Sequence, residues 1–198
     1  FILVRPQMGE NIGAAARAMW NFGLERMRVV SPRDGWPNQK AVAMASGAGR
    51  LLDEALIFPT FEEAIADQNF VFATTARPRD LIKPIYSPKD AIRLAVSKMS
   101  EGQNVGFIFG PERSGLENSD IVKANAIISV PVNEHFPSLN LAQCVLVLAY
   151  EWMLNLNNSD IDSSTSDQSN VVSNMQVEKL CNYFEENSRT FICKLYEQ

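Results

Sequence analysis

Three short segments place polar residues among glycines and prolines directly after predicted strands, where parallel α/β sheets bind their ligands. The first, GENIGAAARAMWNFG, covers residues 9–23, with Asn11 at the start of a predicted helix and Arg17 about two turns later. Asn11 could be an ordinary helix N-cap and Arg17 a solvated surface charge. The alternative, that both side chains face a ligand, is left open by the spacing alone.

The second segment, FIFGPERSGLE, covers residues 107–117 and follows an apolar strand. A plain turn needs no charged pair, yet Glu112 and Arg113 lie here between two glycines and a proline. The pair could bind each other or orient groups of a ligand. Gly110, which has no side chain, would let a ligand approach the backbone closely.

The third segment, VPVNEHFPSLNLA, covers residues 130–142 and leads into a strongly apolar helix. Ser138 can cap that helix through its hydroxyl group. The backbone amides of Ser138, Leu139 and Asn140 would then point outward, where they could hold a ligand. A well-capped helix without a ligand explains the same residues.

Several other chemistries find little support in the residue pattern. The only histidine, His135, has no Ser or Cys arrangement around it, so a hydrolase triad is not supported. Gly47-Ala48-Gly49 lacks a preceding strand and a third glycine, which excludes a dinucleotide-binding fingerprint and a nicotinamide-dependent oxidoreductase. No metal-ligand cluster is present. The three cysteines have no CxxC spacing, so we expect neither disulfides nor zinc, and a cytoplasmic location; Cys144 is predicted to pack in the core.

Short apolar runs alternate with helical patterns over the first 156 residues. The predicted strands are Phe1–Arg5, Met27–Val30, Ala55–Phe58, Phe70–Thr75, Val105–Phe109 and Ala126–Val132, and the predicted helices are Asn11–Phe22, Asn38–Ala48, Phe61–Ala66, Pro88–Met99, Ser119–Ala124 and Leu139–Leu154. This alternation predicts an α/β domain with a mainly parallel sheet and helices on both faces. Thr60 with Glu63, Ser87-Pro88 and Gly23 supply helix start and stop signals.

The predicted last helix is apolar nearly all the way round, so either deep burial or a subunit interface must cover it. Residues 157–174 are rich in Ser, Asn and Asp and are predicted to form a flexible linker. Residues 175–198 are predicted to be a short, partial helical extension. No apolar run is long enough to predict a membrane span.

The net charge of −5 is a poor starting point for a nucleic-acid binder, because phosphate contacts need Lys and Arg. The charge is unevenly distributed, however. Residues 1–113 carry 14 basic and 12 acidic residues, whereas residues 114–198 carry 4 and 11. RNA binding by the first part is therefore permitted.

In this order and spacing, the motifs NIGAAAR, FGPERSGL and SLNLA resemble those of the SpoU/TrmH branch of the SPOUT RNA methyltransferases. The resemblance covers about residues 1–156, and SLNLAQCVLVLAYE, VFATTARPR and RAMWNFGL further resemble the TrmJ-like tRNA methyltransferases. It implies a C-terminal trefoil knot, which is rare among proteins, and a homodimer built around the knot and the last helix. Pro137 departs from the family pattern, in which small polar residues commonly precede SLN.

The resemblance also implies a cofactor and a set of site residues. S-adenosylmethionine would be held largely by backbone groups, without a metal, at Thr74, Thr75, Ala76, Gly110, Val130, Pro137, Ser138 and Leu139. Arg17 would lie nearest the reacting 2′-hydroxyl, with Asn11, Glu112, Ser138 and Asn140 orienting ribose and cofactor. Arg17, Arg77, Arg79 and Arg113 would contact RNA phosphates.

Within the TrmJ-like subgroup, the implied substrate is nucleotide 32, C or U, in the anticodon loop of tRNA. Two alternatives remain: a 2′-O-methyltransferase for another tRNA or rRNA site, and a non-catalytic RNA-binding protein with the same fold.

Overall fold

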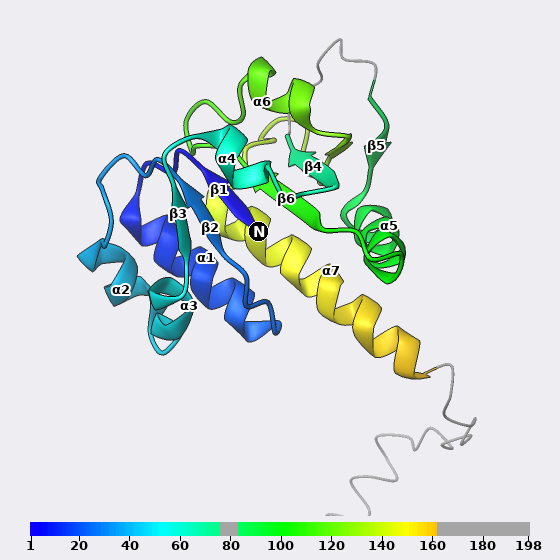
Figure 1. Cartoon of the computed structure of the whole chain (residues 1–198), viewed down its shortest axis with the longest axis horizontal. Helices are drawn as coiled ribbons and strands as arrows, with labels where there is room; N and C mark the ends of the chain where they lie inside the picture. Colours follow the sequence, from blue (N-terminus) through cyan, green and yellow to red (C-terminus); the bar gives the residue numbers. More distant parts are fainter. Residues whose placement is uncertain (76–82, 162–198) are drawn as a thin grey trace, which may run out of the picture. The chain divides into compact units, whose positions relative to one another are not determined.

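Seven parallel strands form the centre of the molecule in the computed structural model, which describes residues 1–75 and 83–161 (Figure 1). The strands are β1 (Ile2–Val4), β2 (Arg28–Val30), β3 (Leu56–Phe58), β4 (Phe70–Thr74), β5 (Ile85–Tyr86), β6 (Val105–Phe109) and β7 (Ala126–Ile128). Their order across the sheet is β3-β2-β1-β6-β4-β7-β5, and every pair is parallel. The carboxyl ends of all strands therefore lie at one edge, as the strand–helix alternation predicts.

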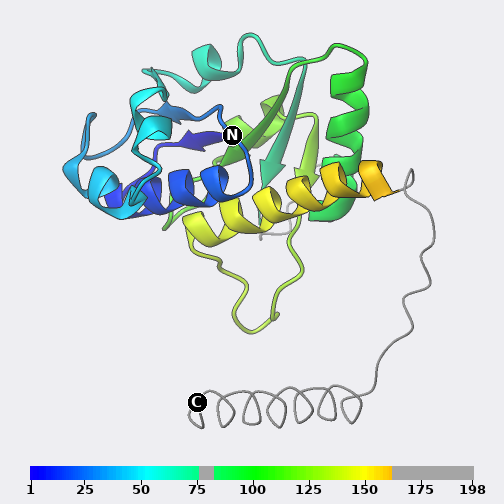
Figure 2. The same ribbon diagram turned by 90° about the horizontal axis from the view of Figure 1, so that it is seen from below.

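Helices cover both faces of this sheet (Figures 1 and 2). One face carries α1 (Gly9–Asn21), α2 (Gln39–Ala45), α3 (Gly49–Asp53), α5 (Pro88–Ser100) and α7 (Leu141–Ile161), and the other carries α4 (Phe61–Ile65) and α6 (Asn118–Lys123). Successive residues of β1 alternate between two cores: Leu3 packs on the first face, and Ile2 and Val4 pack on the second. Burial on both faces explains why the central strands are apolar throughout.

The predicted elements agree with the observed ones to within two residues at each end, except in four places. β5 was not predicted, because two residues are too short for a period-2 pattern. The helix predicted over Asn38–Ala48 ends at Ala45, since Ser46 and Gly47 adopt positive φ angles of 41° and 86°, and α3 follows separately. The strand predicted to Val132 ends at Ile128. α7 begins at Leu141 and continues to Ile161.

The predicted linker is therefore wrong over residues 157–161, which are helical, while residues 162–174 and the predicted extension at 175–198 lie outside the described residues. Three local signals are confirmed. Ser87 accepts a hydrogen bond from the Asp90 amide ahead of Pro88, Thr60 accepts one from the Glu63 amide, and Gly23 is left-handed at φ 69°. The Glu63 carboxylate accepts a hydrogen bond from the Thr60 hydroxyl at 2.9 Å, whereas in a capping box it would accept one from the Thr60 backbone amide.

The apolar surface of α7 has two sides, one buried in the domain and one exposed, so burial within the chain covers only part of it. Val145, Leu148 and Ala149 are fully buried where α7 packs against α1 and α5. Leu146, Tyr150 and Leu154, spaced four residues apart, leave 41%, 50% and 37% of their surface exposed. Residues at this spacing share one helix face, so α7 presents an uncovered apolar stripe beside α1, where Tyr150 contacts Phe22 edge to face.

Candidate ligand-binding site at the carboxyl edge of the sheet

A cavity of about 350 Å³ lies at the carboxyl edge, where β4, β6 and β7 are neighbours. Its walls come from the ends of these strands, the two loops after β6 and β7, and the first turn of α7. The volume is within the range of small-molecule sites, about 300–1,000 Å³. The cavity thus joins the second and third sequence motifs around one space.

Seven of the eight residues predicted to hold a cofactor line this cavity: Thr74, Thr75, Gly110, Val130, Pro137, Ser138 and Leu139. Ala76 lies outside the described residues. The structure also brings Glu112 and Arg113 into the lining. Residues that sequence reasoning missed form the apolar part of the wall, namely Phe109, Ile128, Val132, Leu141 and Cys144. Strand-end Phe and Ile residues give no sequence signal that separates a cavity wall from core packing.

Gly110 is required by the loop itself. A Cβ atom at this position would lie 2.2 Å from the Leu116 nitrogen and 2.5 Å from the Gly115 carbonyl carbon. The expectation that the glycine leaves room for a ligand is therefore corrected: its open side is filled by the returning backbone of residues 115–116. Gly110 lets the loop close into a compact wall for the cavity.

A chain of hydrogen bonds connects all three motifs beside the cavity. Asn140 Nδ2 donates to Asn11 Oδ1 at 2.9 Å, and Asn11 Nδ2 donates to Glu112 Oε1 at 2.8 Å. Glu112 also accepts from the backbone amides of Gln7 at 2.7 Å and Met8 at 3.1 Å. Because an ionised carboxylate only accepts, it fixes which way the Asn11 amide points, and Asn11 fixes Asn140 in turn. We call Asn140, Asn11 and Glu112 the polar relay.

Two predicted capping roles are corrected by this geometry. α1 begins at Gly9 after Met8, so Asn11, which is 8% exposed, is an interior residue of the helix and not its N-cap. At α7, Asn140 and not Ser138 is the cap: Asn140 Oδ1 accepts from the Ala142 amide at 2.9 Å, and Gln143 Oε1 accepts from the Asn140 amide at 3.3 Å. Ser138 is thereby left as a wall residue of the cavity.

Arg17 does not join the polar relay. Six residues along a helix correspond to a rise of about 9 Å and a net turn of about 240°, so Arg17 faces away from Asn11. It is exposed, it is not among the cavity-lining residues, and its guanidinium contacts no partner in the described part of the chain.

The other predicted phosphate contacts are placed only in part. Arg113 is exposed at the cavity and makes no ion pair with Glu112, whose carboxylate is occupied by the polar relay. The alternative of an internal Glu112–Arg113 pair is thereby excluded. Arg77 and Arg79 lie outside the described residues.

An ion pair that the sequence did not reveal anchors the loop after β6. Arg5, directly after β1, binds the carboxylate of Asp120 in α6 and lies 3.7 Å from Glu117. Asp120 is 3% exposed and also accepts from the Glu117 amide at 2.9 Å. A buried carboxylate is tolerated because both a cation and an amide satisfy it. The ion pair therefore fixes the start of α6, which directly follows the loop of residues 110–116.

Cys144 lies on the cavity wall beside Thr74. Burial raises the pKa of its thiol to about 11, and a hydrogen bond with Thr74 opposes that rise. Thr74 also donates to the Ile108 carbonyl at 2.9 Å. Because the pKa lies far above neutral pH, Cys144 stays protonated and acts as wall rather than nucleophile. Cys144 packs against the hydrophobic core, as predicted, and its half-buried side chain also borders the cavity.

Two further properties concern only the described residues. They contain no group of three or more His, Cys, Asp or Glu side chains able to hold a metal ion. None of their helices combines the length and hydropathy needed to cross a bilayer.

The α/β domain described above is similar to known proteins. The SpoU rRNA Methylase family matches residues 1–150. The tRNA (cytidine-2′-O-)-methyltransferase TrmJ of Methanocaldococcus jannaschii is 33% identical over 192 residues, which are 95% of this chain and 82% of that protein.

Solved structures share the fold, among them the following two. TrmJ from Z. mobilis ZM4 is 55% identical with a TM-score of 0.74, over 77% of this chain and 66% of that one, so the match leaves a third of that chain uncovered. The SpoU methyltransferase AviRb from Streptomyces viridochromogenes, in complex with the cofactor AdoMet, has a TM-score of 0.61 over 79% of this chain and 57% of that one. At 19% identity, this second likeness is one of fold alone.

Proposed function

The chain belongs to the SpoU rRNA methylase family as a TrmJ-like methyltransferase, and from this premise we propose that it transfers a methyl group from S-adenosylmethionine to a ribose 2′-hydroxyl of tRNA. The observation that carries the proposal is the joining of all three sequence motifs around one cavity by the polar relay. We assign nucleotide 32, C or U, as the target, because the subgroup motifs resemble the enzymes that modify this position.

The cavity suits S-adenosylmethionine in size and chemistry. The partly exposed apolar side chains of Val130, Val132 and Leu139 offer a surface for a purine ring. The backbone amides of Val130, Ser138 and Leu139 donate to no other described residue, so they are available to polar groups of a ligand. When bound, S-adenosylmethionine supplies a methyl group already activated by a sulfonium centre.

The chain's own residues must mainly align the acceptor with that methyl group. Such alignment can contribute about 7–11 kcal/mol in the best cases. The polar relay holds the loop after β6 and the start of α7 at fixed positions on either side of the cavity. The relay residues Asn11 and Asn140 therefore act as positioning groups, in which Glu112 is the fixed acceptor for Asn11 and Asn11 is the acceptor for Asn140.

Arg17 supplies a second cation, since Arg113 is the only Lys or Arg among the described residues that line the cavity. A guanidinium remains protonated in proteins, so it is unsuited to accept the hydroxyl proton. It can bind the adjacent phosphate and stabilise the negative charge that develops on the 2′-oxygen. Arg113 borders the cavity and would contact a second phosphate; Arg77 and Arg79 are assigned to the same task from the sequence.

Arg17 reaches a cavity most simply in a homodimer. It does not line the cavity of its own chain, and it shares α1 with residues that pack against α7. The apolar stripe of Leu146, Tyr150 and Leu154 gives two copies a surface to bury. We therefore assign the dimer contact to α1 and α7, with Arg17 of each protomer serving the other's cavity.

The trefoil knot is part of the same assignment. The two cavity-forming loops follow β6 and β7, which flank β4 in the sheet, and α7 follows the second loop and packs against α1 and α5. A chain threaded at this point would give the cavity the rigid walls that a cofactor held by backbone groups needs. We expect the enzyme to work in the cytoplasm, where tRNA is modified.

A methyl-transfer assay with nucleotide-resolution mapping tests the proposal. The full chain, total tRNA and S-adenosylmethionine should yield 2′-O-methylation at nucleotide 32. Methylation at another tRNA position, or of rRNA only, would reject the assigned site. If no transfer occurred and calorimetry showed no binding at millimolar S-adenosylmethionine, a non-catalytic RNA-binding role would replace the enzymatic one.

A further inference from the structure

The segment between β7 and α7 carries an aromatic side chain that the proposed mechanism does not use. Residues 129–140 leave the domain and return to it, and Figure 2 shows this segment projecting beyond α7. Phe136 is 74% exposed, more than any other large apolar residue of the described chain. Burying this ring against a partner would be favourable.

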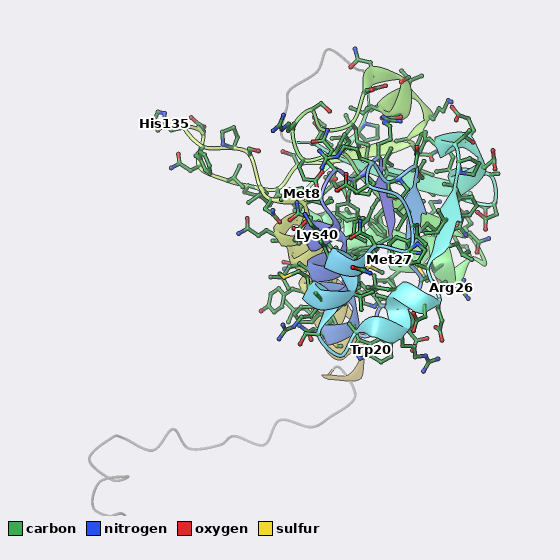
Figure 3. The ribbon with its side chains drawn as sticks, turned by 90° about the vertical axis from the view of Figure 1, so that its left-hand side faces the viewer. Met8, Trp20, Arg26, Met27, Lys40 and His135 are labelled. Atoms are coloured by element: carbon green, nitrogen blue, oxygen red, sulfur yellow. The ribbon has the colours of Figure 1, made fainter. Side chains whose placement is uncertain are left out.

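The tip of this segment is an ordered turn. The Phe136 amide donates to the Asn133 carbonyl at 2.9 Å, and the His135 amide donates to Asn133 Oδ1 at 2.9 Å. These bonds close the chain over four residues, as in a β-turn with an Asx side chain. In Figure 3, His135 lies at the outer end, away from the body of the domain. The turn thus presents its side chains outward.

The turn also stands at the rim of the cavity. Val130 and Val132 line the cavity before the tip, and Pro137 and Ser138 line it after the tip. Consecutive Cα atoms are about 3.8 Å apart, so the Phe136 backbone begins one residue from the cavity wall. A group bound at the cavity mouth would lie within reach of the ring.

We propose that Phe136 stacks on a nucleobase of the RNA, either that of the target nucleotide or that of a direct neighbour. The inference rests on the proposed function and names a recognition residue for it. A ribose presented from a single-stranded loop brings an unstacked base with it, and an aromatic side chain accepts such a base whatever its identity. The tip sequence Asn133-Glu134-His135-Phe136 contains Glu and no Lys or Arg, so it suits the neutral face of a base and not a phosphate.

Three substitutions at one position separate stacking from simple burial. Phe136→Ala should raise the KM for tRNA about 10-fold or more, the usual range for loss of one base–aromatic stack, and leave kcat within about threefold. Phe136→Trp should restore wild-type KM, whereas Phe136→Leu, which keeps apolar area but no ring, should not. Leu56→Ala on β3, 54% exposed, is the matched control and should behave as wild type.

An RNA lacking single bases locates the stack. Anticodon-arm RNAs with an abasic residue at the target position, or at either neighbour, are bound by wild-type protein and by Phe136→Ala. At one of the three positions, base removal should weaken wild-type binding about 10-fold and leave Phe136→Ala unaffected. Additive losses at all three positions would overturn the proposal.

Sedimentation of the same variants tests the competing occupant, a second copy of the chain. If Phe136→Ala dissociated the protein and Phe136→Leu restored its oligomeric state, the ring would belong to a subunit interface and the proposal would be wrong. Failure of the wild-type protein to methylate any RNA would instead reject the proposed function. Wild-type methylation with unchanged KM in Phe136→Ala would reject only the stacking role.

Discussion

Asn11 and Arg17 belong to one motif on one helix, yet the fold treats them in opposite ways. Asn11 is 8% exposed, and both ends of its amide are occupied, by Asn140 and by Glu112. Arg17, less than two turns later, is exposed and contacts no other described side chain. A buried amide with both groups satisfied contributes to the stability of the folded chain. An exposed guanidinium without a partner contributes little.

The difference separates two kinds of functional residue. The task of Asn11 is completed inside the chain, so its loss should change folding stability and activity together. The task of Arg17 is completed by something outside the chain, which is RNA and the cavity of a second copy in our assignment. Stability measurements and activity measurements on matched variants can therefore break or sharpen the comparison.

The largest effect is expected for Arg17→Ala. Removing the only charge assigned to the 2′-oxygen should reduce kcat at least 100-fold, the size seen when one stabilising donor is lost. S-adenosylmethionine affinity and the urea midpoint should stay at their wild-type values, because the Arg17 side chain does not line the cavity of its own chain and contacts no other described side chain. Arg26→Ala, an exposed arginine beyond α1 (Figure 3), is the control and should keep full activity. Wild-type turnover in Arg17→Ala would remove this residue from the mechanism.

Mixed dimers sharpen this result. Ser138→Tyr places a large side chain in the cavity wall and should abolish cofactor binding while Arg17 remains intact. If Arg17 serves the partner's cavity, mixing the two inactive proteins creates dimers with one complete site, and activity should return. Persistent inactivity after verified subunit exchange would place Arg17 at the cavity of its own chain.

Glu112→Gln should destabilise the protein by about 1–3 kcal/mol, because one carboxylate oxygen becomes an NH₂ group that faces an N–H donor. Glu134→Gln is the control, because it makes the same substitution at an exposed residue of the β7–α7 loop that is not part of the polar relay. Urea unfolding at neutral pH measures both. Equal midpoints for the two variants would show that the polar relay does not hold the loops.

Most of the fold followed from the sequence, because its information is local. β6 matches its predicted bounds at both ends, and Ser87-Pro88 marks the start of α5 as the residues themselves require. The errors fall where tertiary structure decides. The apolar run after Ala126 suggested a strand to Val132, but the chain leaves the sheet after Ile128 to form the cavity wall. Ser46 and Gly47 break a continuous helical pattern through backbone conformation alone.

The sequence predicted which residues line the candidate site, but not the contacts that hold them in place. Strand-end motifs placed Gly110 and Ser138 in one pocket, because parallel strands end at a common edge. Nothing in the sequence reveals that Asn11 bonds to Glu112 across about 100 residues, or that Arg5 binds Asp120. Such pairs depend on strand order, since β1 lies beside β6 only in the folded sheet.

A double-mutant cycle on Asn11→Ala and Asn140→Ala measures the link between the first and third motifs. Each single change should cost about 1–2 kcal/mol, the second partly through loss of the α7 cap. The coupling energy should be about 0.5–1.5 kcal/mol, since the two amides share one hydrogen bond at 2.9 Å. Unfolding of the two single variants and the double variant supplies the three numbers. Strict additivity would mean that the 2.9 Å contact carries no energy.

The smallest effect is expected at Ser138, and it separates the two readings of that residue. If Ser138 capped α7, Ser138→Ala would cost about 1 kcal/mol of folding stability. The observed cap is Asn140, whose side chain accepts from the Ala142 amide, so Ser138→Ala should change stability by less than about 0.5 kcal/mol. Its effect should appear instead as weaker S-adenosylmethionine binding by calorimetry, because Ser138 lines the cavity. A stability loss as large as that of Asn140→Ala, with unchanged cofactor affinity, would return Ser138 to the helix and remove it from the site.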